Sequence, residues 1–333
     1  MGQITQSQYP NPDIADRVIK WLLFPQEQLP ADVFVSAVRS HLDNQDSLER
    51  SDILSICCSL VIHDDETNTF RFAHLSVLEY LERLENYSKP SATSLLAEQC
   101  LSWIMTKGDL LEQERMAYRR LFQKTPTWPQ RWQPPSDHLA INLFSGHADV
   151  YWPQYSRFAG HLRSRGRLKL LLETFLLSDT HVTNKDVRHF HCWTTRLDTR
   201  RTFYQQTLII SPPADPLFIA TASNLNEIVA TRIHKKPDAL RGTNSFNFNC
   251  AQVAACCDQP ETLCMILQEI RRLLFPREYM KCAMVEAATM GKASSLAVIF
   301  EVAGSNFVSS DDLQRIVNEA WRTSRDSYAT VMT

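Results

Sequence analysis

The stretch PLFIATASNLNEIV, residues 216–229, recurs in degenerate form toward the C-terminus and decides the fold of that region. The later copies are AQVAACCDQPETL (251–263), MVEAATMGKASSL (284–296) and VNEAWRTSRDSYA (317–329). Aligned on the alanines Ala220, Ala254, Ala287 and Ala320, the copies are spaced by 34, 33 and 33 residues. A period of ~33 residues is that of a stacked helical repeat.

Each copy follows the same internal pattern around its alanine. An apolar or small residue lies three positions before it: Leu217, Ala251, Met284 and Val317. A residue suited to a turn lies four positions after it: Asn224, Asp258, Gly291 and Ser324. Nine positions after it come Val229, Leu263, Leu296 and Ala329, which we expect to face neighbouring helices.

The spacing predicts degenerate ankyrin-type repeats over residues 211–333, each a turn followed by two antiparallel helices. One repeat cannot bury its apolar face alone, so we expect the repeats to stack. The T-P-L-H signature of such repeats is reduced here to Asp215-Pro216-Leu217-Phe218. The alternative is a generic helical bundle in which the regular spacing of the alanines is a coincidence.

The N-terminal part changes its hydrophobic period once. After a polar lead-in (1–12), three helical segments follow, with apolar faces at Ile14, Val18, Trp21 and Leu22, then at Phe34, Ala37 and Val38, then at Ile53, Ile56, Cys57 and Leu60. VIH and TFRFA then flank the turn DDETN, which predicts a β-hairpin. Ser76 and Glu79 suggest a capping box that opens a further helix. This order is typical of a winged-helix domain, which we place at 13–88.

Residues 89–210 are interpreted as a helical connector. Leu96, Cys100, Trp103 and Ile104 form one apolar stripe. The segment TPTWPQRWQPPSD (125–137) contains four prolines and predicts a loop, and helices resume over 139–177. The whole chain is therefore predicted to be mainly α-helical, with one small β-hairpin.

The composition favours an ordinary globular protein. The chain has 333 residues, a formal net charge of −2, 44% hydrophobic residues and only eight glycines. This charge gives no global attraction to nucleic acid or to anionic membranes. The nine cysteines are odd in number and include no C-x-x-C, which indicates a reducing compartment. Neither a membrane-spanning stretch nor a signal peptide is recognised, so we expect a cytoplasmic protein.

Two N-terminal segments resemble the NACHT–ankyrin proteins of filamentous fungi, which are NLR-like signal-transducing ATPases of the STAND class. RVIKWLLFPQEQLPADVFVSAV (17–38) and ILSICCSLVIHDDETNTFRFAHLSVLEYLE (53–82) are similar to the winged-helix segment that follows the nucleotide-binding core in that family. YWPQYSRFAG (151–160) and ADPLFIATASNLNEIV (214–229) look like its helical connector and first repeat. The resemblance covers most of the chain from about residue 13 onward.

The nucleotide-binding core of that family is missing here. No G-x-x-x-x-G-K-[ST] loop occurs, and the nearest imitation, Gly291-Lys292-Ala293-Ser294, has Glu286 where the first glycine belongs. The resemblance therefore implies neither bound nucleotide nor any other cofactor. A gene fragment, a truncated gene model and a natural relative without the ATPase all remain open.

Several polar clusters are candidate sites. His63, Asp64, Asp65 and Glu66 could bind a cation, although a solvated hairpin turn explains them. His189, His191 and Cys192 could begin a metal site, but further ligands are missing nearby. His74 is interpreted as a partly buried, satisfied histidine rather than a general base. Arg157, Arg163, Arg165, Arg167 and Lys169 could contact phosphate or an acidic partner, although a solvated helix face is the simpler interpretation.

These observations predict a non-catalytic protein-interaction module that binds a protein partner through its repeat surface, with no binding residue yet assignable. The alternative is a winged-helix DNA-binding regulator. The third helical segment, SDILSICCSLV (51–61), argues against that alternative because it lacks the Arg, Lys, Asn or Gln that would read base edges. A hydrolase finds no support, since no G-x-S-x-G motif occurs.

Overall fold

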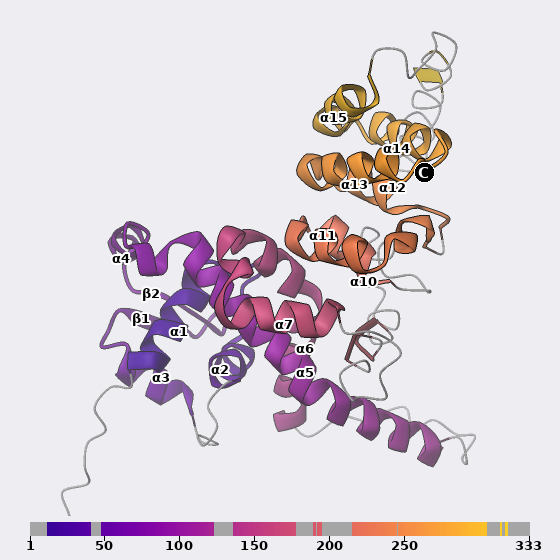
Figure 1. Cartoon of the computed structure of the whole chain (residues 1–333). Helices are drawn as coiled ribbons and strands as arrows, with labels where there is room; N and C mark the ends of the chain where they lie inside the picture. Colours follow the sequence, from indigo (N-terminus) through magenta and orange to yellow (C-terminus); the bar gives the residue numbers. More distant parts are fainter. Residues whose placement is uncertain are drawn as a thin grey trace, which may run out of the picture. The chain divides into compact units, whose positions relative to one another are not determined.

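The computed structural model describes residues 12–40, 48–122, 136–177, 189–190, 192–194, 215–244, 246–304, 314 and 317–318, with side chains undescribed at 107–122 and 136–143. The described chain is mainly helical and contains one small antiparallel hairpin, as predicted (Figure 1). It divides into two compact units, Met1–Phe175 and Leu176–Thr333. Among the residues that the structure describes, no helix combines the length and the apolar character needed to cross a bilayer.

The first unit opens with the predicted order of elements. These are α1 (Pro12–Leu23), α2 (Ala31–Arg39), α3 (Arg50–Ile56), β1 (Val61–Asp64), β2 (Thr69–Phe72), α4 (Leu75–Leu81) and the 3₁₀ turn η1 (Glu85–Tyr87). The strands pair with Val61 opposite Phe72 and Asp64 opposite Thr69. The hairpin packs on α2, where the rings of Phe34 and Phe70 lie 5.1 Å apart. The predicted hairpin turn is thus confirmed.

Two local predictions in this region are wrong. The third helix ends at Ile56 because Cys58 and Ser59 adopt positive φ angles, so Leu60 leaves the helical face and is 42% exposed. The capping box at Ser76 is not formed, since α4 already begins at Leu75 and its N-cap residue is His74. Ser76 therefore lies inside the first turn of α4, where its side chain cannot serve as the N-cap of that helix.

A long helical hairpin completes the first unit. Its elements are α5 (Lys89–Phe122), α6 (Ser136–Phe158), the 3₁₀ turn η2 (Gly160–Ser164) and α7 (Gly166–Leu177). The predicted stripe on α5 is buried: Leu96 and Cys100 are fully buried, Ile104 is 1% exposed and Trp103 is 8% exposed. Of the proline-rich segment 125–137, Ser136 and Asp137 are helical and the rest lies outside the described residues, as do the lead-in 1–11 and most of 178–214. The division between the units falls within the last turn of α7.

The second unit is built from consecutive helix pairs (Figure 1). Its elements are α10 (Pro216–Ala222), α11 (Asn226–Lys235), the 3₁₀ turn η3 (Pro237–Arg241), α12 (Cys250–Cys256), α13 (Pro260–Arg272), α14 (Glu278–Thr289) and α15 (Ala293–Ala303). Among the first helices of the pairs, α12 contacts both α10 and α14. Among the second helices, α13 contacts both α11 and α15. The anchor residues Ala220, Ala254 and Ala287 are all fully buried, so a larger side chain has no room there.

The first helix of each pair ends in the same cap. The residue four positions after each anchor is left-handed, with φ of 56° at Asn224, 51° at Asp258 and 63° at Gly291. The following residue donates its N–H to the anchor carbonyl, over 2.9 Å at Ala220, 3.0 Å at Ala254 and 2.8 Å at Ala287. This is the Schellman arrangement, which favours Gly and Asn. The sequence period of 33–34 residues is therefore also a period of backbone conformation.

The fourth copy of the sequence pattern, residues 317–329, is described only at positions 317 and 318. Ala320, Ser324 and Ala329 lie outside the described residues. Val317, which aligns with Leu217 and Met284 in the sequence pattern, is 58% exposed, whereas those two residues are buried.

Candidate binding surfaces

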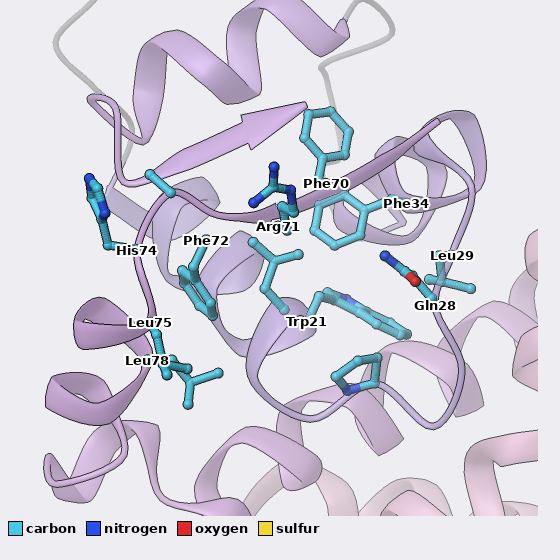
Figure 2. Close-up of a pocket in the computed structure, with 13 residues that line it drawn as sticks. Trp21, Gln28, Leu29, Phe34, Phe70, Arg71, Phe72, His74, Leu75 and Leu78 are labelled. Atoms are coloured by element: carbon cyan, nitrogen blue, oxygen red, sulfur yellow. The ribbon is translucent and has the colours of Figure 1, made fainter. Parts of the chain in front are cut away.

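An apolar cavity of about 510 Å³ opens on the first unit (Figure 2). Helices α1 and α2, the loop between them, strand β2 and the start of α4 all contribute to its wall. The lining residues are Trp21, Leu22, Pro25, Gln28, Leu29, Phe34, Phe70, Arg71, Phe72, Ala73, His74, Leu75 and Leu78. Leu75 is 69% exposed, so apolar surface continues beyond the cavity.

The loop between α1 and α2 is fixed by hydrogen bonds to distant elements. The backbone N–H of Gln26 donates to Tyr155 Oη over 3.2 Å, and Gln28 Nε2 donates to Thr69 Oγ1 over 2.8 Å. Behind the loop, the indole of the fully buried Trp21 packs on Tyr155 and donates Nε1–H to Gln99 over 2.6 Å. The cavity wall is thus held rigidly before any ligand arrives.

A carboxylate, an imidazole and a hydroxyl are aligned beside this loop. His147 Nδ1 lies 3.1 Å from Glu27 Oε1, and its Nε2 lies 3.0 Å from Tyr155 Oη. The bond from His147 is the main cause of the lowered pKa of Glu27. Burial raises the pKa of Tyr155 well above its usual value, and this residue is 0% exposed. A substrate cannot reach that hydroxyl, so the cluster positions the loop and is no nucleophilic triad.

The acidic hairpin turn bonds to itself. The two ring nitrogens of His63 lie 2.9 Å from Asp65 Oδ1 and 3.2 Å from Asn68 Oδ1. Asp64 accepts backbone N–H groups from Thr67 and Glu66, and these bonds help to lower its pKa. Asp64 and one oxygen of Asp65 are therefore used within the hairpin, and the Asp65 side chain is 95% exposed, which supports the simpler interpretation of a solvated turn.

His74 differs from its predicted environment. We expected a partly buried and satisfied histidine, but His74 is exposed at the rim of the cavity and its side chain makes no capping bond to α4 (Figure 2). The reason is the early start of α4, which leaves His74 as an extended residue between strand and helix. No carboxylate or hydroxyl lines the cavity near it to complete a catalytic set.

The predicted metal cluster is only partly described. His189 and Cys192 belong to short helical segments, and His191 lies outside the described residues. Over the described ranges, no group of three or more His, Cys, Asp and Glu side chains is close enough to hold a metal ion.

The predicted basic run does not form one solvated helix face. Arg163 is only 9% exposed and donates to the backbone oxygen of Arg157 over 3.4 Å. Lys169 lies 3.8 Å from Glu173. The run is split because η2 ends and α7 begins within it, so neighbouring residues point in different directions.

Helix α3 carries an arginine that the prediction left out. The helix begins at Arg50, one residue before the predicted segment. Arg50 Nε donates to Asp32 of α2 over 3.0 Å. Its guanidinium is therefore engaged within the first unit and is not held ready for a base edge.

The two ends of the helix pairs in the second unit differ in character. At the short-turn end, the buried hydroxyls of Thr262 and Ser295 donate to Asn224 Oδ1 over 2.7 Å and to Asp258 Oδ1 over 3.0 Å. Each bond joins a helix to the cap of the preceding pair. Polar groups at this end are therefore used for internal cohesion.

The opposite, long-loop end exposes apolar side chains. Leu274, in the turn between α13 and α14, is 89% exposed, and Phe246, in the loop before α12, is 44% exposed. Sequence reasoning missed both residues, because apolar letters in a turn region are ordinarily assigned to the core. No family model, curated protein or solved structure matches this chain.

Proposed function

We propose that this chain is a non-catalytic protein-interaction module whose second unit carries the binding surface, built from degenerate ankyrin-type helix pairs. The observation that carries the proposal is the recurrence of one cap at Asn224, Asp258 and Gly291, in step with the sequence period. Stacked repeats of this kind offer an extended surface to a partner without needing a reactive group. The described residues supply no catalytic constellation that competes with this proposal.

The same proposal includes a relationship to the NACHT–ankyrin class. It is supported by the order of α1, α2, α3, the β-hairpin and α4, together with the quoted sequence segments. A reading of the genomic sequence upstream of the Met1 codon tests this relationship. An in-frame Walker A loop there would support the relationship and would identify this chain as the C-terminal part of a full receptor of this class.

A display selection tests the binding function directly. Random peptides of about twelve residues are selected against the full chain, and the footprint of each bound peptide is mapped by hydrogen exchange. We expect slower exchange in the helices α10 to α15. Protection confined to the first unit would overturn the assignment of the surface.

A DNA shift assay on the full chain tests the alternative, a winged-helix DNA-binding regulator. Nanomolar binding of duplex DNA that weakens steeply with salt would favour that alternative. We expect no such binding, since the arginine on α3 is already bonded to Asp32.

A further inference from the structure

Leu274 combines two unfavourable features. It adopts a φ of 55° at the position after α13 that corresponds to Asn224, Asp258 and Gly291 after the first helices. A leucine in this left-handed conformation is strained, whereas Gly or Asn is not. Its side chain is also 89% exposed to water. Folding gains nothing visible from a leucine here, which points to a role in binding.

Phe246 is presented in a comparable way. The side-chain oxygen of Asn244, which is 2% exposed, accepts the backbone N–H groups of Phe246 and Phe248, each over 2.9 Å. These bonds order the loop, while the ring of Phe246 remains 44% exposed. An exposed aromatic ring on an ordered loop loses little conformational entropy when it binds.

Contacts join the two loops into one surface. The guanidinium of Arg241, at the end of η3, lies 4.5 Å from the ring centre of Phe275, and Tyr279 Oη donates to the backbone oxygen of Arg241 over 3.5 Å. Both loops also lead into neighbouring helices, α12 and α14. We call this surface, residues 235–244, 246–249 and 269–281, the basic ledge.

The charge of the basic ledge is one-sided. It contains seven Lys and Arg residues against three Asp and Glu residues. The short-turn end, residues 222–227, 256–261 and 288–294, contains three acidic residues and one lysine. Helix dipoles explain basic residues in the last turns of α11 and α13.

We propose that the basic ledge binds an acidic peptide segment of a partner protein, in which aliphatic or aromatic residues alternate with Asp and Glu. This inference rests on the proposed interaction function. Complementary charge steers the acidic segment to the ledge, and apolar partner side chains cover Leu274 and Phe246. A nucleic acid fits less well, because the exposed leucine offers nothing to phosphate, whereas an apolar side chain of the peptide would cover it.

The test uses the peptides selected against the full chain. We expect the enriched peptides to be rich in Asp and Glu with interspersed Leu or Phe. Leu274→Asn should weaken their binding by about tenfold or more, while the variant melts no lower than the parent, because Asn suits the left-handed cap. Arg272→Gln should weaken binding by about threefold, with a smaller effect at high salt.

Two matched controls lie at the other end of α14. Met290→Asn removes a side chain that is 42% exposed, and Lys292→Gln removes a charge, both at the short-turn end. Neither should change peptide affinity. Enriched peptides without acidic residues, or affinities insensitive to Leu274→Asn, would overturn the ledge as the site.

The outcomes separate this inference from the proposed function. Peptides that protect α10 to α15 but ignore the Leu274 and Arg272 variants would leave the interaction function standing and refute the basic ledge. Peptides that protect no helix of the second unit would refute both. Binding of mixed-sequence duplex DNA that is lost in the same two variants would reassign the ledge to nucleic acid.

Discussion

Glu286 of α14 is a carboxylate kept partly out of water by the second unit. Burial raises its pKa, and Cys256 Sγ lies 3.8 Å from Glu286 Oε2. Burial also raises the pKa of the Cys256 thiol to about 12, so this thiol stays protonated and can donate. The pair is therefore a structural contact between α12 and α14: the thiol hydrogen bond favours the ionised form of Glu286, but burial opposes ionisation more strongly.

Glu286→Gln should stabilise the chain at neutral pH. A carboxyl group whose folded pKa is raised leaves the fold most stable when it is protonated, and that stability is lost as pH rises from about 4.5 through the folded pKa. We expect the free energy of unfolding to increase by roughly 0.5–1 kcal/mol at pH 7, and no gain below pH ~4. Urea unfolding at both pH values measures this. The exposed Glu301→Gln is the control, and an equal gain there would contradict the explanation.

The loop between α1 and α2 shows how one residue can hold an element. His147, whose side chain is 1% exposed, bonds to Glu27 with one ring nitrogen and to Tyr155 with the other. His147→Phe keeps the ring but removes both bonds, and should cost about 2–3 kcal/mol in the free energy of unfolding. Tyr151→Phe, which removes a solvent-exposed bond to the same carboxylate, should cost less than about 0.5 kcal/mol. Comparable losses in the two variants would argue against this account.

Helix ends set the regularity of the second unit. In each of three pairs, the chain leaves the first helix through a left-handed residue and enters the second helix at once. Asn, Asp and Gly tolerate this conformation for different reasons, which is why the sequence varies while the backbone repeats. What recurs in each pair is the backbone conformation of the cap, and the residue type at that position varies.

Gly291→Ala should show the cost of this cap. An added Cβ would meet no atom within 4 Å, so only the positive φ opposes alanine here. We expect a loss of about 1 kcal/mol in the free energy of unfolding, measured by chemical denaturation. A neutral effect would mean that the turn can relax to a right-handed conformation.

At the scale of the whole molecule, cohesion of the second unit depends on small residues between stacked helices. Ala287 is fully buried, and α14 contacts α12 and α15 around it. Ala287→Arg should therefore destabilise the unit by about 3–5 kcal/mol, because a charge would be forced between packed helices. Hydrogen exchange of the full chain should accelerate in α12 to α15. The exposed Ala297→Arg in α15 is the matched control and should leave exchange unchanged.

Much of the helical content was predictable because apolar residues recur at helical spacing in long segments, as in α1, α2 and α5. Element boundaries were less predictable. Leu60 and Ser76 continue an apolar or capping pattern, yet backbone conformations at Cys58, Ser59 and His74 end or start the elements elsewhere. Local patterns compete at such points, and the packing of the hairpin decides between them.

The amino-acid sequence by itself determined the helical class, the hairpin and the 33–34-residue period, because each depends on the spacing of nearby residues along the chain. Only the tertiary structure decided that His147 faces Glu27, that the basic run is divided and that Leu274 lies in water. Those outcomes depend on which distant segments pack together, and a side chain's neighbours across 120 residues leave no mark on local periodicity.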